Sequence, residues 1–277
     1  PETLVLTDDG HYPIYSLWAG NYPENQQESH KMVNIWNGTE FSEVEVMKTG
    51  EDQELVEVFT SDGVSMVCTP YHKFFIREND DIYIKEARDL NPEDELQECP
   101  AFPCTDKGES IERMKAIDLG IEVGMMSLRL TDETVLTSNI FVPMYYNLQT
   151  KLDWLAGFLE PYVCDLRIDK ESHIYIPCKS LIFLQDLKWM LQTCGINTYI
   201  QCVEDDTKNL VIAVIQIKRL MQFGLAFYHD YFKEKEISAA EMASEIMKPI
   251  IKITRVEQLT RRDDTYCFVE PLQHAGV

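Results

Sequence analysis

Hydrophobic and polar residues alternate along the first hundred positions in short runs that are separated by turn signals. Residues 41–46 and 54–59 alternate with a period of two, which is typical of strands that bury one face. Asn37-Gly38 and Asp62-Gly63 favour tight hairpin turns. Further strand-like runs occupy residues 3–7, 33–36, 64–68, 73–76 and 82–84. The pattern predicts an antiparallel, mainly β unit.

The pattern changes near residue 110. Apolar residues there recur with a helical period, beginning at residues 110–118 with Ser110 as the expected N-cap. Helices are also predicted at residues 152–159, 181–193 and 217–225, and strands at 173–177, 198–203, 210–216, 250–256 and 265–269. Two β segments around an α/β segment indicate one domain inserted into a loop of another. We expect residues 1–148 and 249–277 to form the β domain and residues 149–248 the insert.

Composition narrows the class of protein. Of the 277 residues 45% are hydrophobic, the usual share for a packed domain. No uncharged apolar run is long enough for a membrane span, and the first residues show no signal-peptide core. We therefore expect a cytoplasmic, monomeric protein without a membrane partner. The formal charge of −22 opposes binding to nucleic acid, because phosphate neutralisation needs clustered Lys and Arg.

The eight cysteines carry no obvious metal-binding pattern. None forms a Cys-x-x-Cys pair, and most lie in apolar runs, so buried free thiols are the simplest interpretation. Cys99 and Cys104 flank two prolines, but no second ligand pair follows at zinc spacing. We expect neither a metal nor a cofactor.

One short segment carries candidate chemistry. Pro70 favours a turn that brings Thr69 and His72 together around one peptide bond. An imidazole there can protonate a departing amide nitrogen, and a hydroxyl can polarise or orient the peptide. The spacing alone is weak, because a structural turn with a hydrogen-bonded histidine has the same sequence pattern.

The surroundings of Thr69 and His72 resemble the intein motif that carries a characteristic Thr and His. Residues 1–10 with Pro13-Ile14 look like the first intein motif from just after its start, and residues 85–96 resemble the part of the Hint domain that follows the His motif. Residues 265–270 resemble the penultimate intein strand, where Cys267 takes a position at which Asp is commoner. His274 falls where the family often has a His. The amino-acid sequence of this tail is most similar to that of inteins of the ribonucleotide reductase large subunit.

The resemblance implies autocatalytic protein splicing in a horseshoe-like Hint domain. A nucleophile a few residues before Pro1 would attack the preceding carbonyl, with His72 protonating the leaving nitrogen and Thr69 orienting the peptide. The partners would be the flanking extein segments in cis, and Cys267 and His274 would couple the later steps to Asn cyclisation. Because the terminal nucleophiles are missing, we expect the chain as given to be inert. A buried strand thiol at Cys267 and a surface histidine at His274 are the alternatives.

Residues 154–163 resemble the LAGLIDADG helix of homing endonucleases, in which small residues such as Ala156 and Gly157 let two helices pack closely. In that family the eighth position carries a metal-binding acid, but here it is Tyr162, and Pro161 is expected to disturb the helix end. Glu160 stands at the sixth position, where a surface or capping carboxylate is the alternative. Asp165 and Asp169 are further candidate metal ligands, although carboxylates in loops usually do not bind a metal ion. With one motif we expect no DNA cleavage, and Mg²⁺ would matter only if the insert were active.

Two other functions stay open on sequence alone. One is a site-specific DNA homing endonuclease, and the other is a non-catalytic acidic binding module with a β unit similar to Hint. Cleavage of an intein-less host gene with magnesium would identify the first. A nucleophile just upstream, with Asn and a nucleophile just downstream, would argue against the second.

Overall fold

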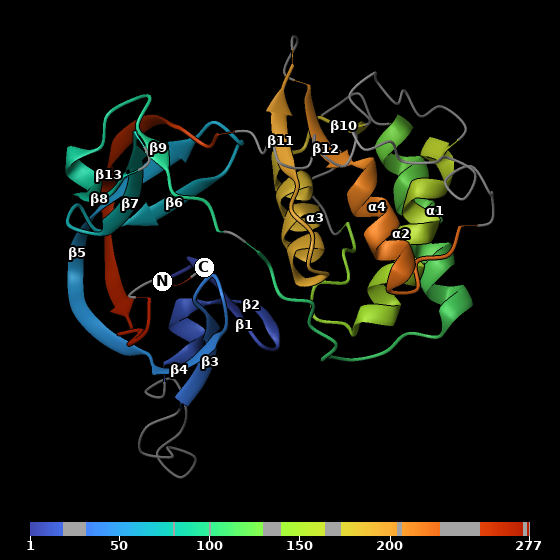
Figure 1. The fold of residues 1–277 in the computed structure, drawn as a ribbon, viewed down its shortest axis with the longest axis horizontal. Coiled ribbons are helices and arrows are strands. Elements are labelled where there is room, and N and C mark those ends of the chain that lie inside the picture. The colour runs from blue at the N-terminus through green and yellow to red at the C-terminus, as the bar shows by residue number, and fades with distance from the viewer. Residues whose placement is uncertain are drawn as a thin grey trace. The chain divides into compact units, whose positions relative to one another are not determined.

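The structure is a computed structural model in which two compact units are defined (Figure 1). It describes residues 1–18, 32–79, 81–99, 101–129, 140–163, 173–203, 207–227, 250–273 and 276. Unit 1 comprises Pro1–Ala101 with Ile250–Val277, and unit 2 comprises Phe102–Pro249. The second boundary agrees with the predicted one within a residue. The first lies at Ala101 rather than at residue 148, because the helix that begins unit 2 packs along the helix predicted to open the insert.

Unit 1 is built from antiparallel strands, which confirms the predicted mainly β unit. Its first sheet has the order β2-β1-β3-β4, its second β13-β5-β6 and its third β8-β7-β9. The strands are β1 Leu4–Thr7, β2 Gly10–Pro13, β3 Met32–Trp36, β4 Phe41–Glu45, β5 Met47–Thr60, β6 Ser65–Cys68, β7 Lys73–Glu78, β8 Asp81–Glu86, β9 Glu95–Leu96 and β13 Ile253–Cys267. The described residues of unit 1 also include two short 3₁₀ helices, η1 Ile14–Leu17 and η3 Ala87–Asp89.

The tail of the chain forms one long strand rather than the two predicted. β13 pairs with β5 from Ile253 opposite Thr60 to Cys267 opposite Met47, with several register shifts between them. The middle of this strand was not predicted, because its run of charged residues interrupts the alternation of apolar and polar positions. Arg262, in this charged run, forms ion pairs of 3.1 Å with Glu54 and 3.2 Å with Asp52 of the facing strand β5. A solvent-exposed edge strand can carry such charges without losing its ladder bonds.

Two hydrophobic clusters of described residues stabilise unit 1, and both contain residues of the C-terminal segment that begins at Ile250. In the first, Tyr266 and Phe268 of the tail pack against buried residues of the head: Val5, Ile14, Leu17, Ile35, Val44 and Val46. In the second, Ile253 is fully buried with Val56, Val58, Ile76, Ala87 and Leu90. The hydrophobic effect therefore ties the two ends of the sequence into one folded unit.

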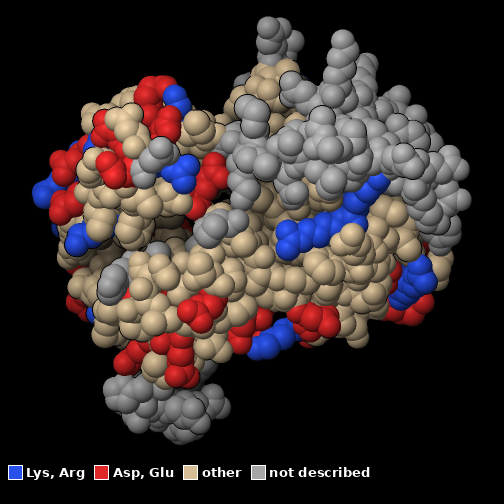
Figure 2. Space-filling view, viewed as in Figure 1, with Lys and Arg blue, Asp and Glu red and all other residues tan. Residues whose placement is uncertain are grey.

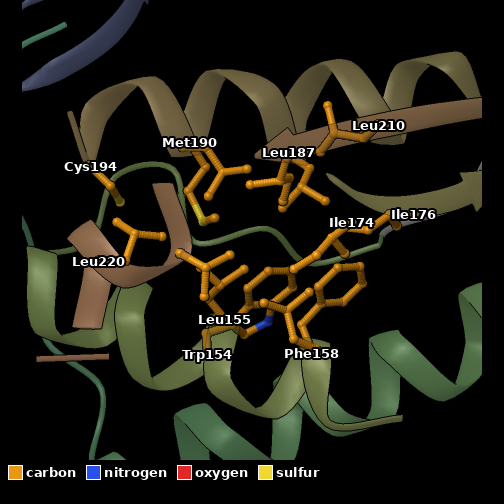
Figure 3. Close-up of a cluster of buried hydrophobic side chains, with 14 of the residues drawn as sticks. Trp154, Leu155, Phe158, Ile174, Ile176, Leu187, Met190, Cys194, Leu210 and Leu220 are labelled. Carbon is orange, nitrogen blue, oxygen red and sulfur yellow. The ribbon is translucent and has the colours of Figure 1, made fainter. Parts of the chain in front are cut away.

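Among its described residues, unit 2 combines four α-helices with a three-stranded antiparallel sheet of order β10-β12-β11. The elements are α1 Arg113–Arg129, α2 Leu148–Val163, β10 His173–Cys178, α3 Leu181–Thr193, β11 Tyr199–Cys202, β12 Lys208–Ala213 and α4 Val214–Gln222. Trp154, Leu155 and Phe158 of α2 are buried against side chains from α3 and the sheet (Figure 3). The helix that resembles LAGLIDADG is thus a central core element of this unit.

Two local expectations for the helices were wrong. α1 begins at Arg113, and the carboxylate of Glu112 rather than Ser110 accepts hydrogen bonds from the first free amides, at 3.1 and 3.0 Å. α2 continues through Pro161 to Val163, because a proline near the end of a helix removes only one backbone bond. Among the described residues, no helix has the length and apolar character needed to span a membrane.

Candidate functional site

The Thr-Pro-Tyr-His segment forms a tight turn between β6 and β7. The amide of His72 donates a 3.0 Å hydrogen bond to the carbonyl of Thr69, and this bond closes the turn. The turn is also held from η3, because Arg88 N donates to the Pro70 carbonyl at 2.9 Å and Ala87 N donates to the His72 carbonyl at 2.8 Å. Thr69 is buried. Thr69 and His72 are therefore fixed on one turn, as the sequence predicts.

The ring of His72 lies edge-on to Phe74, with centroids 5.3 Å apart and an interplanar angle of 78°. One side of the residue is open to solvent, while the neighbouring protein desolvates the imidazole and lowers its pKa. A histidine with a lowered pKa is mostly neutral at pH 7. Its protonated form is a stronger proton donor than an ordinary histidine, because the surroundings disfavour the charged imidazole. Burial raises the pKa of the adjacent Cys68 thiol to about 12, so Cys68 is protonated and a poor nucleophile.

The first residues of the chain run beside the strand that leads into this turn. Thr3 Oγ1 donates a 3.0 Å hydrogen bond to the carbonyl of Val67. Ile14 N donates to the Thr3 carbonyl at 2.9 Å, and Tyr15 N donates to the Pro1 carbonyl at 3.2 Å. The start of the chain is thus held between η1 and β6, and its contact with β6 lies two residues before Thr69 in the sequence.

Charged groups at the middle of β13 surround the same region. Glu2 pairs with Arg261 at 3.1 Å. The pKa of Asp264 is lowered chiefly by its hydrogen bond with Lys48, and the amine of Pro1 adds a smaller electrostatic contribution. These interactions bring the head of the chain to the middle of β13.

The turn itself reaches the same part of the sheet. Tyr71 Oη donates to the side-chain oxygen of Gln53 at 3.4 Å, and Gln53 pairs with Asp263 in the ladder of β5 and β13. The turn, the first residues and β13 therefore meet within unit 1.

Cys267 lies at the end of β13 with its side chain exposed, so the alternative of a buried thiol is wrong. Its neighbours Tyr266 and Phe268 pack against the core, and its Sγ lies 3.4 Å from the Phe268 carbonyl oxygen. Within the part of the chain that the structure describes, no hydrogen bond joins Cys267 to Thr69 or His72. His274 lies outside the described residues.

A buried carboxylate, Glu270, anchors the tail and was not predicted from the sequence. Glu270 is only 3% exposed, and it accepts hydrogen bonds from Asn37 Nδ2 at 3.3 Å, Leu272 N at 3.1 Å and Gln273 N at 2.5 Å. Burial raises its pKa, but these bonds and one from Ser42 outweigh burial and lower the pKa to about 2. The usable signal was an acid directly before Pro271 at the end of a strand-like run.

In unit 2, α1 and α2 pack closely and run in the same direction. Near their starts Ile111 N donates to Thr150 Oγ1 at 3.0 Å, and near their ends Ser127 Oγ and Tyr162 Oη share a hydrogen bond. Glycines permit this approach. A Cβ added to Gly157 would lie 2.1 Å from the Ile117 carbonyl oxygen, far inside contact distance. The sequence predicted such a close helix pair but did not identify α1 as the partner.

The helix that resembles LAGLIDADG carries no acid at the position where the resemblance predicts a metal ligand. Tyr162, at that position, is 3% exposed and bonded to the buried Ser127. Burial raises the pKa of this phenol to about 12, so the pair is neutral at ordinary pH. Glu160 is half-buried on the last turns of α2. Asp165 and Asp169 lie outside the described residues, and among the described His, Cys, Asp and Glu no group could hold a metal ion.

The surface charge matches the acidic composition. Acidic side chains gather over the displayed face of unit 1, and the basic ones in view are separate groups among them (Figure 2). With 47 acidic against 25 basic residues, the chain as a whole carries an excess of negative charge.

The chain was compared with known proteins by sequence and by structure. No protein-family model matches the chain. The chain is 28% identical, over 341 aligned residues, to the ribonucleoside-diphosphate reductase large subunit of Invertebrate iridescent virus 6. That alignment includes all of this chain and 34% of the viral protein, so the chain spans about a third of its relative. Among solved structures, the PabCDC21-1 intein matches with a TM-score of 0.31 and 17% identity, over 36% of this chain and 69% of that one. A TM-score of that size is too low to assign a fold.

Proposed function

We propose that this chain is the body of an intein whose unit 1 performs protein splicing. The observation that carries the proposal is the hydrogen bond from Thr3 to the Val67 carbonyl, which holds the start of the chain against the strand entering the Thr69–His72 turn. The hydrophobic cluster in which Tyr266 and Phe268 of the tail pack against Val5 and its neighbours in the head supports it. A self-excising segment needs this arrangement, because it must act on both of its own ends at once.

The residues of unit 1 would act on the peptide bond at the upstream junction. The scissile bond would lie a few residues before Pro1, where the family has its first nucleophile. Attack on the preceding carbonyl forms an ester or thioester and breaks the C–N bond, while His72 gives a proton to the departing nitrogen. Thr69, held rigidly by the buried turn, would orient the carbonyl. The downstream nucleophile then takes over the acyl group, and cyclisation of a terminal Asn releases the intein.

The exposed Cys267 fits a role in coupling these steps. Its thiol is solvent-accessible and lies on the tail strand, whereas its neighbours are packed in the core. His274 would act nearby on the final junction. Glu270 would position both, since its bonds to Leu272 and Gln273 fix the turn that connects them.

The host we propose is the ribonucleotide reductase large subunit. Support comes from the viral relative, whose printed name is that of this enzyme and of which the chain matches about a third. A segment can be inserted into a host at one point when its ends lie close together. Gly276 lies near Ile35 of β3, which pairs with Thr7 of β1, so the tail returns to the sheet that holds the head. The flanking reductase segments would be the partners in cis.

We propose further that unit 2 is a LAGLIDADG-like insert without nuclease activity. The parallel, glycine-packed α1 and α2 support the kinship. The bonded Tyr162 and Ser127 in place of metal-binding acids, and the acidic surface, support the loss of cleavage. The alternative function, a site-specific homing endonuclease, is tested by incubating the chain with Mg²⁺ and an uninterrupted host gene, where we expect no cut.

The splicing test uses the chain with ten natural residues on each side, placed between two reporter proteins. We expect mass spectrometry to detect the ligated reporters and the free 277-residue body with its short ends. A precursor with His72→Ala is expected to yield no ligated product. A wild-type precursor that folds but never ligates its reporters would refute the proposal.

A further inference from the structure

Two cysteines that are far apart in the sequence face each other in unit 2. Cys104 and Cys194 form an isolated antiparallel β-bridge. Thr105 N donates to the Thr193 carbonyl at 2.9 Å, and Thr105 Oγ1 donates to the same oxygen at 3.3 Å. The position of these bonds makes the two cysteines a non-hydrogen-bonded pair.

The geometry of such a pair suits a disulfide. Non-hydrogen-bonded partners in an antiparallel ladder have Cα atoms about 4.5 Å apart and side chains on the same face. A disulfide needs Cα atoms about 4.4 to 6.8 Å apart. Both thiols are free in this structure. The backbone therefore needs little movement to join them.

The two thiols have different environments. Cys104 is exposed, and Cys194 is fully buried. Lys151, itself only 1% exposed, donates from Nζ to Thr193 Oγ1 at 2.9 Å, next to Cys194 in the chain. Lys151 also interacts electrostatically with both thiols. Desolvation and the charge of Asp106 raise the pKa of the Cys104 thiol, although Lys151 and Arg219 act in the opposite direction. The exposure of Cys104 makes it the thiol of the pair that a dissolved disulfide can reach, and Cys194 is then the resolving partner.

We propose that Cys104 and Cys194 form a reversible disulfide by exchange with a small-molecule disulfide such as oxidised glutathione. The Cys104 thiolate attacks one sulfur of the reagent, which breaks the reagent's S–S bond and releases one small thiolate. Cys194 then attacks Sγ of Cys104 and releases the second. Two protein thiols are oxidised and one small disulfide is reduced to two small thiols, whose sulfurs take up the two protons that the protein thiols lose.

The burial of the cluster agrees with this order of events. Burial raises the pKa of the Cys194 thiol to about 12 and lowers the pKa of the Lys151 amine. Cys194 therefore stays protonated until Cys104 presents a mixed disulfide beside it. The product would fasten the segment that opens unit 2 to the C-terminal end of α3, where Thr105 is already bonded.

The test is oxidation of the full chain with oxidised glutathione, followed by acid quenching, alkylation and peptide mapping. We expect a peptide linked between Cys104 and Cys194, a mass lower by two hydrogens and full reversal by a reducing agent. The melting temperature should rise by several degrees, because the cross-link closes a long loop in the unfolded chain. A stable glutathione adduct at Cys104, or a link between other cysteines, would overturn the proposal.

Variants separate the two steps. C194S is expected to trap one glutathione on Cys104, and C104S to form no cross-link. C104S is the decisive variant if C194S fails to fold, because Cys104 is exposed and its replacement leaves the core intact. C202S is the matched control, since Cys202 is also an exposed cysteine of unit 2 but faces Lys208 across the ladder. It should cross-link like the wild type, and failure to do so would also count against the pair.

Discussion

The Thr3 hydroxyl donates to the Val67 carbonyl and thereby joins residues that are 64 positions apart in the sequence. This bond places the start of the chain next to the strand that ends at the Thr69–His72 turn. A Thr-x-x-His turn with a purely structural role is not expected to lie beside the first residues of its own chain. The proposed splicing function depends on this juxtaposition.

Replacing Thr3 by Val removes the hydroxyl and nearly keeps the shape. We expect the free energy of unfolding to fall by about 1 kcal/mol, the usual cost of one such bond. We also expect splicing of the flanked precursor to slow several-fold, because the upstream junction loses its position. Urea denaturation and a splicing time course measure the two effects. Thr39→Val is the control, since Thr39 bonds only locally to Asn37; equal effects of both variants would contradict the assigned role.

Replacing His72 by Ala removes the proposed acid while leaving the backbone bonds of the turn. General acid catalysis usually contributes at least about a hundredfold, so cleavage at the upstream junction should fall by that factor or more. Lys73→Ala alters the next, exposed residue and should splice normally. Gel analysis of precursor processing gives the rates. A His72→Ala precursor that splices at the wild-type rate would remove His72 from the mechanism.

Glu270 makes stability depend on acid pH. Its folded pKa of about 2 lies below the ordinary value of 4.5, so its contribution is complete above pH 4.5 and disappears as the pH falls toward 2. Glu270→Gln should lower the free energy of unfolding by about 1 to 3 kcal/mol at pH 7 and less at pH 2.5. Denaturation at several pH values measures this. Glu257→Gln changes an exposed acid on β13 and should have little effect; a Glu270→Gln loss that does not shrink in acid would contradict the account.

Gly157 allows α1 and α2 to pack backbone to backbone. Because an added Cβ would lie 2.1 Å from the Ile117 carbonyl oxygen, Gly157→Ala should destabilise unit 2 by at least about 1 to 3 kcal/mol. Glu122→Ala, at an exposed position of α1, should be neutral or slightly stabilising through helix propensity. Urea denaturation compares the two variants. A Gly157→Ala chain as stable as the wild type would mean that the helices do not pack this closely.

The sequence predicted those parts of the fold that local patterns determine. The helix Leu181–Thr193 was predicted to the residue, because Ser180 caps it and its apolar face is regular. Most strands of the first hundred residues were placed by their alternation and their Asn-Gly and Asp-Gly turns, whereas β2 and β9 were not predicted. The Thr69–His72 turn was identified for the same reason, since Pro70 and its neighbours determine it locally.

Features that depend on distant partners were not predictable. The polar middle of β13 is a strand only because β5 lies beside it. The Glu270 anchor depends on Asn37, which is remote in the sequence, and the place of α1 depends on its fit to Gly157. Local patterns report propensity, whereas these features arise from tertiary contacts.

The most direct measurement is capture of the first splicing intermediate. The chain with its natural upstream junction is treated with hydroxylamine, which cleaves esters and thioesters but not ordinary peptide bonds. We predict release of the upstream reporter from the wild type and no release from Thr69→Val or His72→Ala. Equal release from all three proteins would contradict the proposed role of the turn. A wild type that is folded and yet resists hydroxylamine would contradict an activated junction at the head of this chain.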